Sequence, residues 1–331
     1  MIVVKAKRFL FISAVVLISA VCLAVMNINY DRLSRYPYED KAARALIEEY
    51  FSNKDIEYII EYSISPSEFI DFISYPEFSV YHAAEYNQIR NSIWYLDNEQ
   101  VVKVVELARE KMTMEELIHF LIEYDGQTVM NYLSLEDTSD TILIKNPSSS
   151  SAYVDDINTV HTRILFDALP VVSLPSKDVQ VTVASAVLEP VKNMCMAIET
   201  ELDLHKTCGG LIADAGYVSY DEQALLFEEA KLVHGEDALL YADSAGHSEH
   251  QLGLALDFSV EGFKKEHFDD SIQYEWLKNN AHRFGFVQSY QKEKEEITGK
   301  AERSWHWRFV GYEIAAKMYF EHLSLKEAVY E

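Results

Sequence analysis

Basic residues are scarce in this chain. Its 331 residues include 29 lysines and arginines against 54 aspartates and glutamates, which gives a formal net charge of −25. Because contacts to phosphate backbones need a basic surface, this deficit argues against a nucleic-acid partner. With 49% hydrophobic and 25% charged residues, the composition is that of a globular protein, and the length allows two domains.

Cysteine is also rare, with only three residues in the chain. Cys22 lies in an apolar run, which leaves Cys195 and Cys208 in the rest of the sequence. These two either form a disulfide between the end of a helix and the start of the next strand, or remain separate, with Cys195 in the core of a helix. The spacing alone is compatible with both arrangements.

Charge is absent from one long stretch, the 18 residues from Phe9 to Met26. Lys5, Lys7 and Arg8 precede it. This pattern predicts a single-pass membrane anchor within residues 1–30, with a cytoplasmic N-terminus and the bulk of the chain extracytoplasmic. A cleaved signal peptide is the alternative, although no clear small-x-small cleavage site follows the run.

Residues 31–135 are predicted to form a helical domain. Ser65 and Thr113 each begin a capping-box pattern that is followed by apolar residues at helical spacing. No catalytic constellation occurs here, and the pattern does not identify a protein partner. The composition then shifts, with four consecutive serines ending at Ser151. We interpret this shift as a domain boundary, so that residues 136–331 form a second domain.

Two separate motifs of the second domain carry metal-binding residue types. The motif S-E-H-Q-L-G-L-A-L-D contains His250 and Asp257, and S-W-H-W-R-F-V-G contains His306. Two imidazoles and one carboxylate leave a coordination position open, which is the usual arrangement for catalytic Zn²⁺. Alternating apolar residues predict strands over Leu252–Phe258 and through the second motif, with His250 in the loop before the first strand.

These motifs, together with A-G-Y-V-S-Y-D-E-Q at 215–223 and E-E-I-T-G at 295–299, resemble the zinc D-alanyl-D-alanine carboxypeptidases of the VanY kind. The resemblance covers residues 142–311. It implies an α+β fold in which a small antiparallel sheet bears the zinc between helices, as in lysostaphin and hedgehog. It also implies Zn²⁺ as cofactor and removal of the terminal D-Ala from peptidoglycan stem peptides.

The resemblance further assigns substrate contacts to Ser219, Gln223 and Ser248, and it places Tyr217 at the pocket wall. Each residue also has a structural interpretation. Ser219 can be a helix N-cap, Gln223 a surface polar residue, and Tyr217 a core residue. Glu249 is expected to be solvated.

Three positions depart from the family pattern. Arg303 stands where the family has a Glu that serves as general base and acid, Val218 where an Arg stabilises the oxyanion, and Ser289 where a further Arg is expected. Glu302 is the nearest acid, but a shift of one residue along a strand points a side chain to the other face. A positioned acid/base contributes about 10²–10⁴-fold to rate and an oxyanion donor about 10²–10³-fold.

These losses leave two functional hypotheses. The first is a membrane-anchored zinc carboxypeptidase with weak or altered activity, including cleavage of a different bond in the stem peptide. The second is a catalytically silent zinc-containing module that binds or scaffolds cell-wall peptides.

Overall fold

The computed structural model describes residues 11–23, 31–134, 141–160, 168–176 and 180–330. The chain divides into two compact units, Met1–Glu106 and Leu107–Glu331. Residues 11–23 are helical, whereas the remainder of the predicted anchor lies outside the described residues. Within the described part of the chain, none of the helices combines the length and the apolar character needed to span a bilayer.

The N-terminal unit is helical, as the sequence predicts. Asp40 caps helix α2 (Lys41–Tyr50) by accepting hydrogen bonds from the backbone N–H groups of Ala42 and Ala43. Apolar side chains on the inner faces of the helices form one buried cluster that includes Ile47, Ile59 and Phe69. The α-helices of this part are α2 (Lys41–Tyr50), α3 (Asn53–Glu61), α4 (Ala83–Ser92) and α5 (Asn98–Ala108).

The division between the units falls earlier than the predicted boundary at residue 135. Helices α6 (Met114–Glu123) and α7 (Gly126–Leu133) belong to the C-terminal unit. The hydroxyl of Tyr124 donates to the carbonyl of Ile144 at 2.8 Å, and Lys145 pairs with Glu116 at 2.9 Å. These contacts attach α6 and the residue after it to the segment just before the four serines, which the composition shift cannot reveal.

A four-stranded antiparallel sheet lies at the centre of the C-terminal unit, with strand order β5-β6-β8-β7. In the register of β6 and β8, Asp257 lies directly opposite His306 and Leu256 opposite Trp307. Because side chains alternate between faces, the first pair shares one face of the sheet and the second pair the other. The strands are β5 (Leu211–Ala215), β6 (Ala255–Val260), β7 (Phe286–Gln288) and β8 (His306–Phe309).

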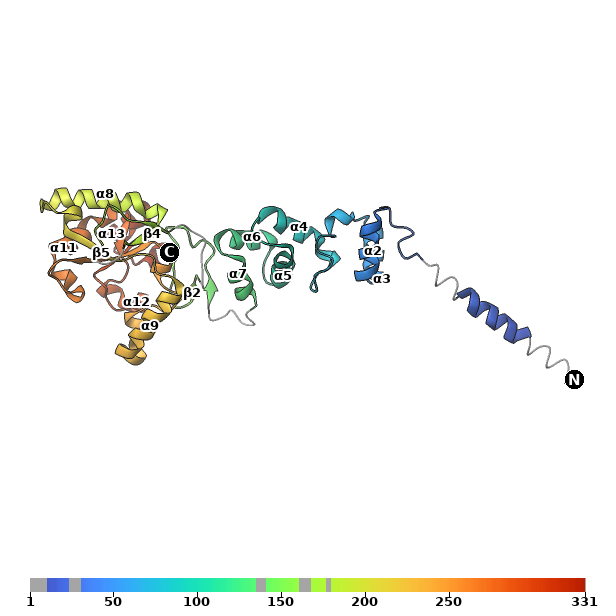
Figure 1. The fold of residues 1–331 in the computed structure, drawn as a ribbon. Helices are drawn as coiled ribbons and strands as arrows, with labels where there is room; N and C mark the ends of the chain where they lie inside the picture. Colours follow the sequence, from blue (N-terminus) through green and yellow to red (C-terminus); the bar gives the residue numbers. More distant parts are fainter. Residues whose placement is uncertain (1–10, 24–30, 135–140, 161–167, 177–179, 331) are drawn as a thin grey trace. The chain divides into compact units, whose positions relative to one another are not determined.

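Helices surround this sheet (Figure 1). Helix α8 buries an apolar face that includes Val191, Met194 and Ile198. Cys195 of α8 forms a disulfide with Cys208, which settles the alternative that the spacing left open. The helices of this unit after α7 are α8 (Ser185–Leu202), α9 (Tyr220–His234), α10 (Ala238–Tyr241), α11 (Ile272–Asn280), α12 (Glu295–Thr298), α13 (Tyr312–Glu321) and α14 (Leu325–Tyr330).

Two short ladders complete the unit. Strand β1 (Ile142–Leu143) pairs in parallel with β2 (Asn158–Thr159), and β3 (Ala168–Pro170) pairs antiparallel with β4 (Thr182–Ala184). The expected mixture of a helical domain and a small antiparallel sheet flanked by helices is therefore present. The described residues do not support the membrane helix that was predicted to precede it.

The predicted strand at Leu252–Phe258 begins later than expected. A 3₁₀ turn, η5 (Glu249–Leu252), occupies its start, and Gly253 ends this turn with φ of +66°. Glycine adopts this left-handed conformation without the steric penalty of a Cβ. The alternating apolar residues therefore enter the sheet only from Ala255, at the start of β6.

Candidate metal centre

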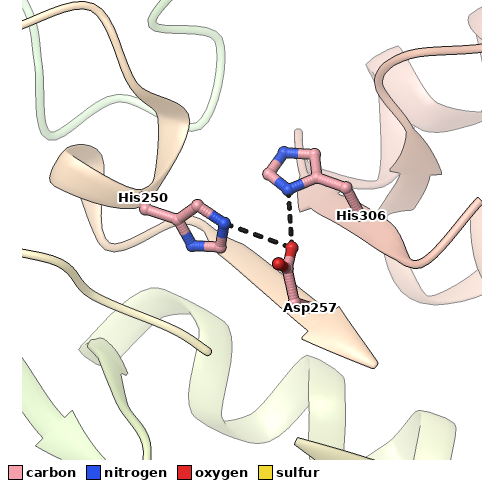
Figure 2. Close-up of side chains that lie close together, drawn as sticks. All are labelled: His250, Asp257 and His306. Carbon is pink, nitrogen blue, oxygen red and sulfur yellow. Dashed lines mark hydrogen bonds and ion pairs between the residues drawn. The ribbon is translucent and has the colours of Figure 1, made fainter. Parts of the chain in front are cut away.

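Three elements bring the predicted donors together at one face of the sheet. His250 lies in η5, Asp257 on β6 and His306 on the neighbouring strand β8. Figure 2 shows both imidazole rings directed at the Asp257 carboxylate. One donor atom from each residue lies within 4.8 Å of the others. Asp257 and His306, which are 49 residues apart in the sequence, lie side by side because β6 and β8 are paired in this register.

The orientation of His250 is fixed from the side away from the cluster. Its Nδ1 lies 2.6 Å from the carbonyl oxygen of Gly216, which can only accept, so Nδ1 carries the hydrogen. The other nitrogen, Nε2, therefore faces Asp257 Oδ1 at 3.2 Å. This arrangement presents Nε2 as the atom that can coordinate a cation.

His306 is held between two carboxylates. Its Nδ1 donates to Asp257 Oδ1 at 2.8 Å, and its Nε2 donates to Glu249 Oε2 at 2.9 Å. Burial disfavours the charged imidazole, but these two hydrogen bonds outweigh burial and raise the pKa of His306 to about 9. A cation bound at this centre would replace the Nδ1 proton.

Asp257 is the central acceptor of the cluster. Besides the two histidines, it receives a hydrogen bond from Lys265 Nζ to Oδ2 at 2.8 Å. Burial opposes ionisation of this carboxyl, yet the charge and hydrogen bond of His250, with Lys265, hold its pKa well below the usual range. Asp257 is therefore ionised at neutral pH, as a metal ligand must be.

Glu249 corrects one sequence expectation, because it is buried rather than solvated. Its side chain is 2% exposed. In addition to His306, Glu249 contacts Ser289, whose hydroxyl donates to Oε2 at 2.6 Å, and Arg308, whose Nη1 lies 3.5 Å from Oε1. The alternation of apolar residues could not locate Glu249, since the residue lies in a 3₁₀ turn that precedes the strand.

Arg303, which replaces the family glutamate, is committed to a buried ion pair. Its Nη1 donates to Asp243 Oδ2 at 2.9 Å, and its guanidinium lies 4.5 Å from the centre of the Tyr290 ring. Lys300 approaches the same carboxylate, with Nζ 3.4 Å from Oδ1. Burial alone would raise the pKa of Asp243, but Arg303 and Lys300 lower it to about 2.

Glu302, the nearest acid in sequence, lines a different part of the molecule. It lies on a cavity of about 390 Å³ together with Tyr274, Gln288 and Trp307, and none of the three donor residues lines that cavity. Trp307 occupies the sheet face opposite His306. Burial and the nearby carboxylate of Asp269 raise the pKa of Glu302.

The predicted substrate residues serve structural roles in this conformation. Ser219 is the N-cap of α9 and forms a capping box with Glu222. Gln223 is buried and donates to the backbone carbonyl of Asp243 at 2.7 Å, and Ser248 is buried and caps η5. The backbone N–H of Tyr217 donates to the carbonyl of Thr182 on β4.

The donor set fits zinc better than calcium or magnesium. Two imidazole nitrogens and one carboxylate oxygen suit Zn²⁺, whereas Ca²⁺ and Mg²⁺ prefer oxygen ligands. The three donors leave room in a tetrahedral arrangement for one further ligand.

Comparisons with known proteins agree with this geometry. Residues 183–312 match the family model VanY, D-alanyl-D-alanine carboxypeptidase. The chain is 46% identical to a D-alanyl-D-alanine carboxypeptidase of Enterococcus faecalis over 82 residues, which are 25% of this chain and 30% of that protein. It is 35% identical to an enzyme of the same name from Enterococcus faecium over 116 residues, 35% of each chain. The matches thus span about a third of these relatives.

Solved structures show the same likeness. The LdcB LD-carboxypeptidase, whose structure is described as revealing the basis of peptidoglycan recognition, is 28% identical with a TM-score of 0.51. That match covers 59% of this chain and 92% of LdcB. A mutant VanY D,D-pentapeptidase in complex with Zn(II) is 26% identical with a TM-score of 0.44, covering 54% of this chain and 98% of that one.

Proposed function

We propose that residues 183–312, which match the VanY carboxypeptidase family model, bind Zn²⁺ and peptidoglycan stem peptides ending in D-Ala but hydrolyse them weakly or not at all. The donors His250, Asp257 and His306 support the zinc site. The observation that carries the loss of hydrolysis is the buried pair between Arg303 and Asp243 where the family places its general base.

The bound ion would polarise the carbonyl of the terminal peptide bond. The chain's own residues hold the ligands: the Gly216 carbonyl fixes His250, and Glu249 fixes His306. What is missing is a group that can take a proton from water and return it to the leaving amine. Burial favours the neutral form of Arg303, but Asp243 outweighs burial and raises its pKa, so Arg303 stays charged and cannot act as a base.

Among the described residues, neither Glu302 nor Val218 compensates for this loss. Glu302 lines a cavity that the three donors do not share, and Val218 has no charge to offer an oxyanion. Without the general base, turnover should fall by about 10²–10⁴-fold, and without the oxyanion arginine by about 10²–10³-fold. The two losses overlap in part, but together they favour a peptide-binding module over an efficient enzyme.

A slow carboxypeptidase is the second candidate function. The intact donor set favours it, and so does the likeness to LdcB, which is named as an LD-carboxypeptidase. This likeness also keeps open a different bond of the stem peptide as the target. The products of an incubation with a synthetic stem pentapeptide separate these possibilities, because D-Ala release and cleavage elsewhere give different fragments.

The decisive experiment measures zinc content, peptide binding and peptide cleavage on the same purified chain. We expect stoichiometric zinc, saturable peptide binding that requires zinc, and D-Ala release lower by about 10²-fold or more than that of an intact VanY enzyme. An Asp257→Asn variant provides the zinc-free control. Release at the rate of the intact enzyme would refute the silent module, and failure to take up zinc would refute both candidates.

Restoration of the family residues sharpens this test. Arg303→Glu must be combined with Asp243→Asn, because a glutamate beside Asp243 would place two carboxylates together in a buried site. With Val218→Arg added, D-Ala release should rise by about 10²-fold or more. The matched control carries Arg303→Gln in place of Arg303→Glu and should show no such rise.

We further propose that the chain is anchored in the cell membrane by residues 1–30, with the bulk of the chain extracytoplasmic. The uncharged run from Phe9 to Met26, with cations before it, supports an anchor. The disulfide between Cys195 and Cys208 is compatible with an oxidising compartment. Cell fractionation should place the chain in the membrane fraction. Protease added to intact cells from outside should release the C-terminal unit. Resistance to the protease while the cells remain intact would contradict this topology.

A further inference from the structure

The buried carboxylate of Glu249 has a role that neither the family pattern nor the donor set assigns. We infer that Glu249 is a positioning residue: it holds Nε2–H of His306, so that Nδ1 points toward the metal. This inference rests on the proposed zinc site. It concerns one residue, Glu249, that contacts a ligand without being a ligand itself.

The hydrogen-bond pattern fixes which nitrogen of His306 is available. Glu249 Oε2 lies 2.9 Å from Nε2, and an ionised carboxylate can only accept. The hydrogen must therefore be on Nε2. The lone pair left on Nδ1, once its proton is displaced, faces Asp257 Oδ1 at 2.8 Å and the ring of His250. A histidine ligand whose other nitrogen donates to a carboxylate has a fixed tautomer and a more basic donor atom.

Two neighbours besides His306 contact the Glu249 carboxylate and orient it. Arg308, which is fully buried, lies 3.5 Å from Oε1 and is itself held by the backbone carbonyl of Ala152, which accepts from Nη2 at 2.6 Å. Ser289 donates to Oε2 at 2.6 Å. With the Arg308 guanidinium at one oxygen, and the Ser289 hydroxyl and His306 at the other, the Glu249 carboxylate faces hydrogen-bond donors on both sides.

Ser289 gives this arrangement a meaning specific to the present chain. The family pattern has an arginine at this position, and here a short hydroxyl donates to Glu249 instead. In this chain the carboxylate that orients His306 therefore receives a hydrogen bond from a neutral hydroxyl at this position.

The test compares two isosteric substitutions of buried, arginine-paired carboxylates. Glu249→Gln keeps the size of the side chain, but its amide N–H₂ must face either Arg308 or His306, both of which are donors. Asp243→Asn makes the same change at the partner of Arg303. The Asp243 carboxylate has no hydrogen bond to a metal ligand among the described contacts. Zinc affinity is measured by competition with a chelator, and unfolding of the metal-free variants is followed in parallel.

We expect Glu249→Gln to weaken zinc binding by about 10–100-fold, which is the range observed when a residue that hydrogen-bonds to a metal ligand is lost. Asp243→Asn should change it by less than about threefold, whatever its effect on the melting temperature. Long-range ¹⁵N spectra of the zinc-loaded proteins supply a second readout: a single species with hydrogen on Nε2 of His306 in the parent chain, and a mixed population in Glu249→Ala.

Three results would overturn the inference. The first is an unchanged zinc affinity in Glu249→Gln, with the parent chain binding zinc normally; this would leave the proposed function intact. The second is an equal loss of affinity in Asp243→Asn, which would indicate a general effect of removing a buried carboxylate. The third is an absence of zinc uptake by the parent chain, which would refute the proposed function as well.

Discussion

Two buried arginine–carboxylate pairs differ in how they reach His306. The ligand-side pair, Arg308 and Glu249, contacts it directly, since His306 Nε2 donates to Glu249 at 2.9 Å. The side chains of the base-side pair, Arg303 and Asp243, have no hydrogen bond to the imidazole of His306 among the described contacts. The ring of Tyr290 packs on both the Arg303 guanidinium and the His306 imidazole, and the backbone carbonyl of Arg303 accepts from the backbone N–H of His306 at 3.1 Å.

The comparison separates the requirements of metal binding from those of catalysis. Metal binding needs donors in fixed orientations, and a carboxylate held by an arginine serves that purpose well. Proton transfer needs a group that changes its protonation state near neutral pH. The base-side pair cannot do this, because Arg303 stays charged and the pKa of Asp243 is lowered to about 2. The ligand-side pair supports a metal site, whereas the base-side pair occupies the position of a catalyst.

The strongest way to break this comparison is to remove the central donor. Asp257→Asn replaces a carboxylate that both histidines contact with a neutral amide, which is a poor ligand for Zn²⁺. We expect zinc uptake to fall below stoichiometry, as measured by metal analysis after dialysis against micromolar chelator. Retention of a full equivalent of zinc by a folded variant would show that these residues do not form the site.

The next largest effect concerns the stability of the base-side pair. Arg303→Glu would place a second carboxylate beside Asp243 in a site where both side chains are less than a tenth exposed. Loss of one partner of a buried ion pair costs about 3–5 kcal/mol of unfolding free energy. Arg303→Glu with Asp243→Asn should recover part of that loss. Urea unfolding monitored by circular dichroism provides the measurement, and equal stability of the single and double variants would argue against the pairing.

The pH dependence of stability gives a smaller effect with a definite sign. The folded-state pKa of Asp243, about 2, lies below its ordinary value near 4, so Asp243 contributes stability above pH 4 that is lost as the pH falls toward 2. The contribution is about 2 kcal/mol. Asp243→Asn should be less stable at neutral pH, and its unfolding free energy should fall less steeply between pH 4 and pH 2. Parallel pH profiles for the two proteins would contradict this assignment.

The sequence predicted the donors because their spacing and family motifs survive. His250, Asp257 and His306 require only that two strands carry them to one sheet face, and alternating apolar residues reveal such strands. The surroundings could not be predicted in the same way. Glu249 lies in a 3₁₀ turn without periodic signal, and Asp243 lies in a loop 60 positions from Arg303. Pairings of this kind depend on tertiary packing.

The same limit applies to the fold. The sequence left Ser219 open between a helix N-cap and a substrate contact, and the structure shows it as the N-cap of α9, which begins at Tyr220. The bond between Cys195 and Cys208 remained undecided, because it depends on where the end of α8 lies relative to η3 (Thr207–Gly210). The division at Glu106 also differs from the predicted boundary, since the contacts of α6 with residues 145–148 leave no trace in composition.

The smallest effect tests the ligand-side pair through its neutral member. Ser289→Ala removes the hydrogen bond to Glu249 Oε2 but leaves Arg308 in place. Because a buried hydrogen bond contributes about 1 kcal/mol, zinc affinity should fall by no more than about fivefold. Ser259→Ala, which removes a hydroxyl bonded to Asp214 on the same sheet, is the control and should leave zinc affinity unchanged. A loss in Ser289→Ala as large as that in Glu249→Gln would mean that the hydroxyl, rather than Arg308, keeps this carboxylate in place.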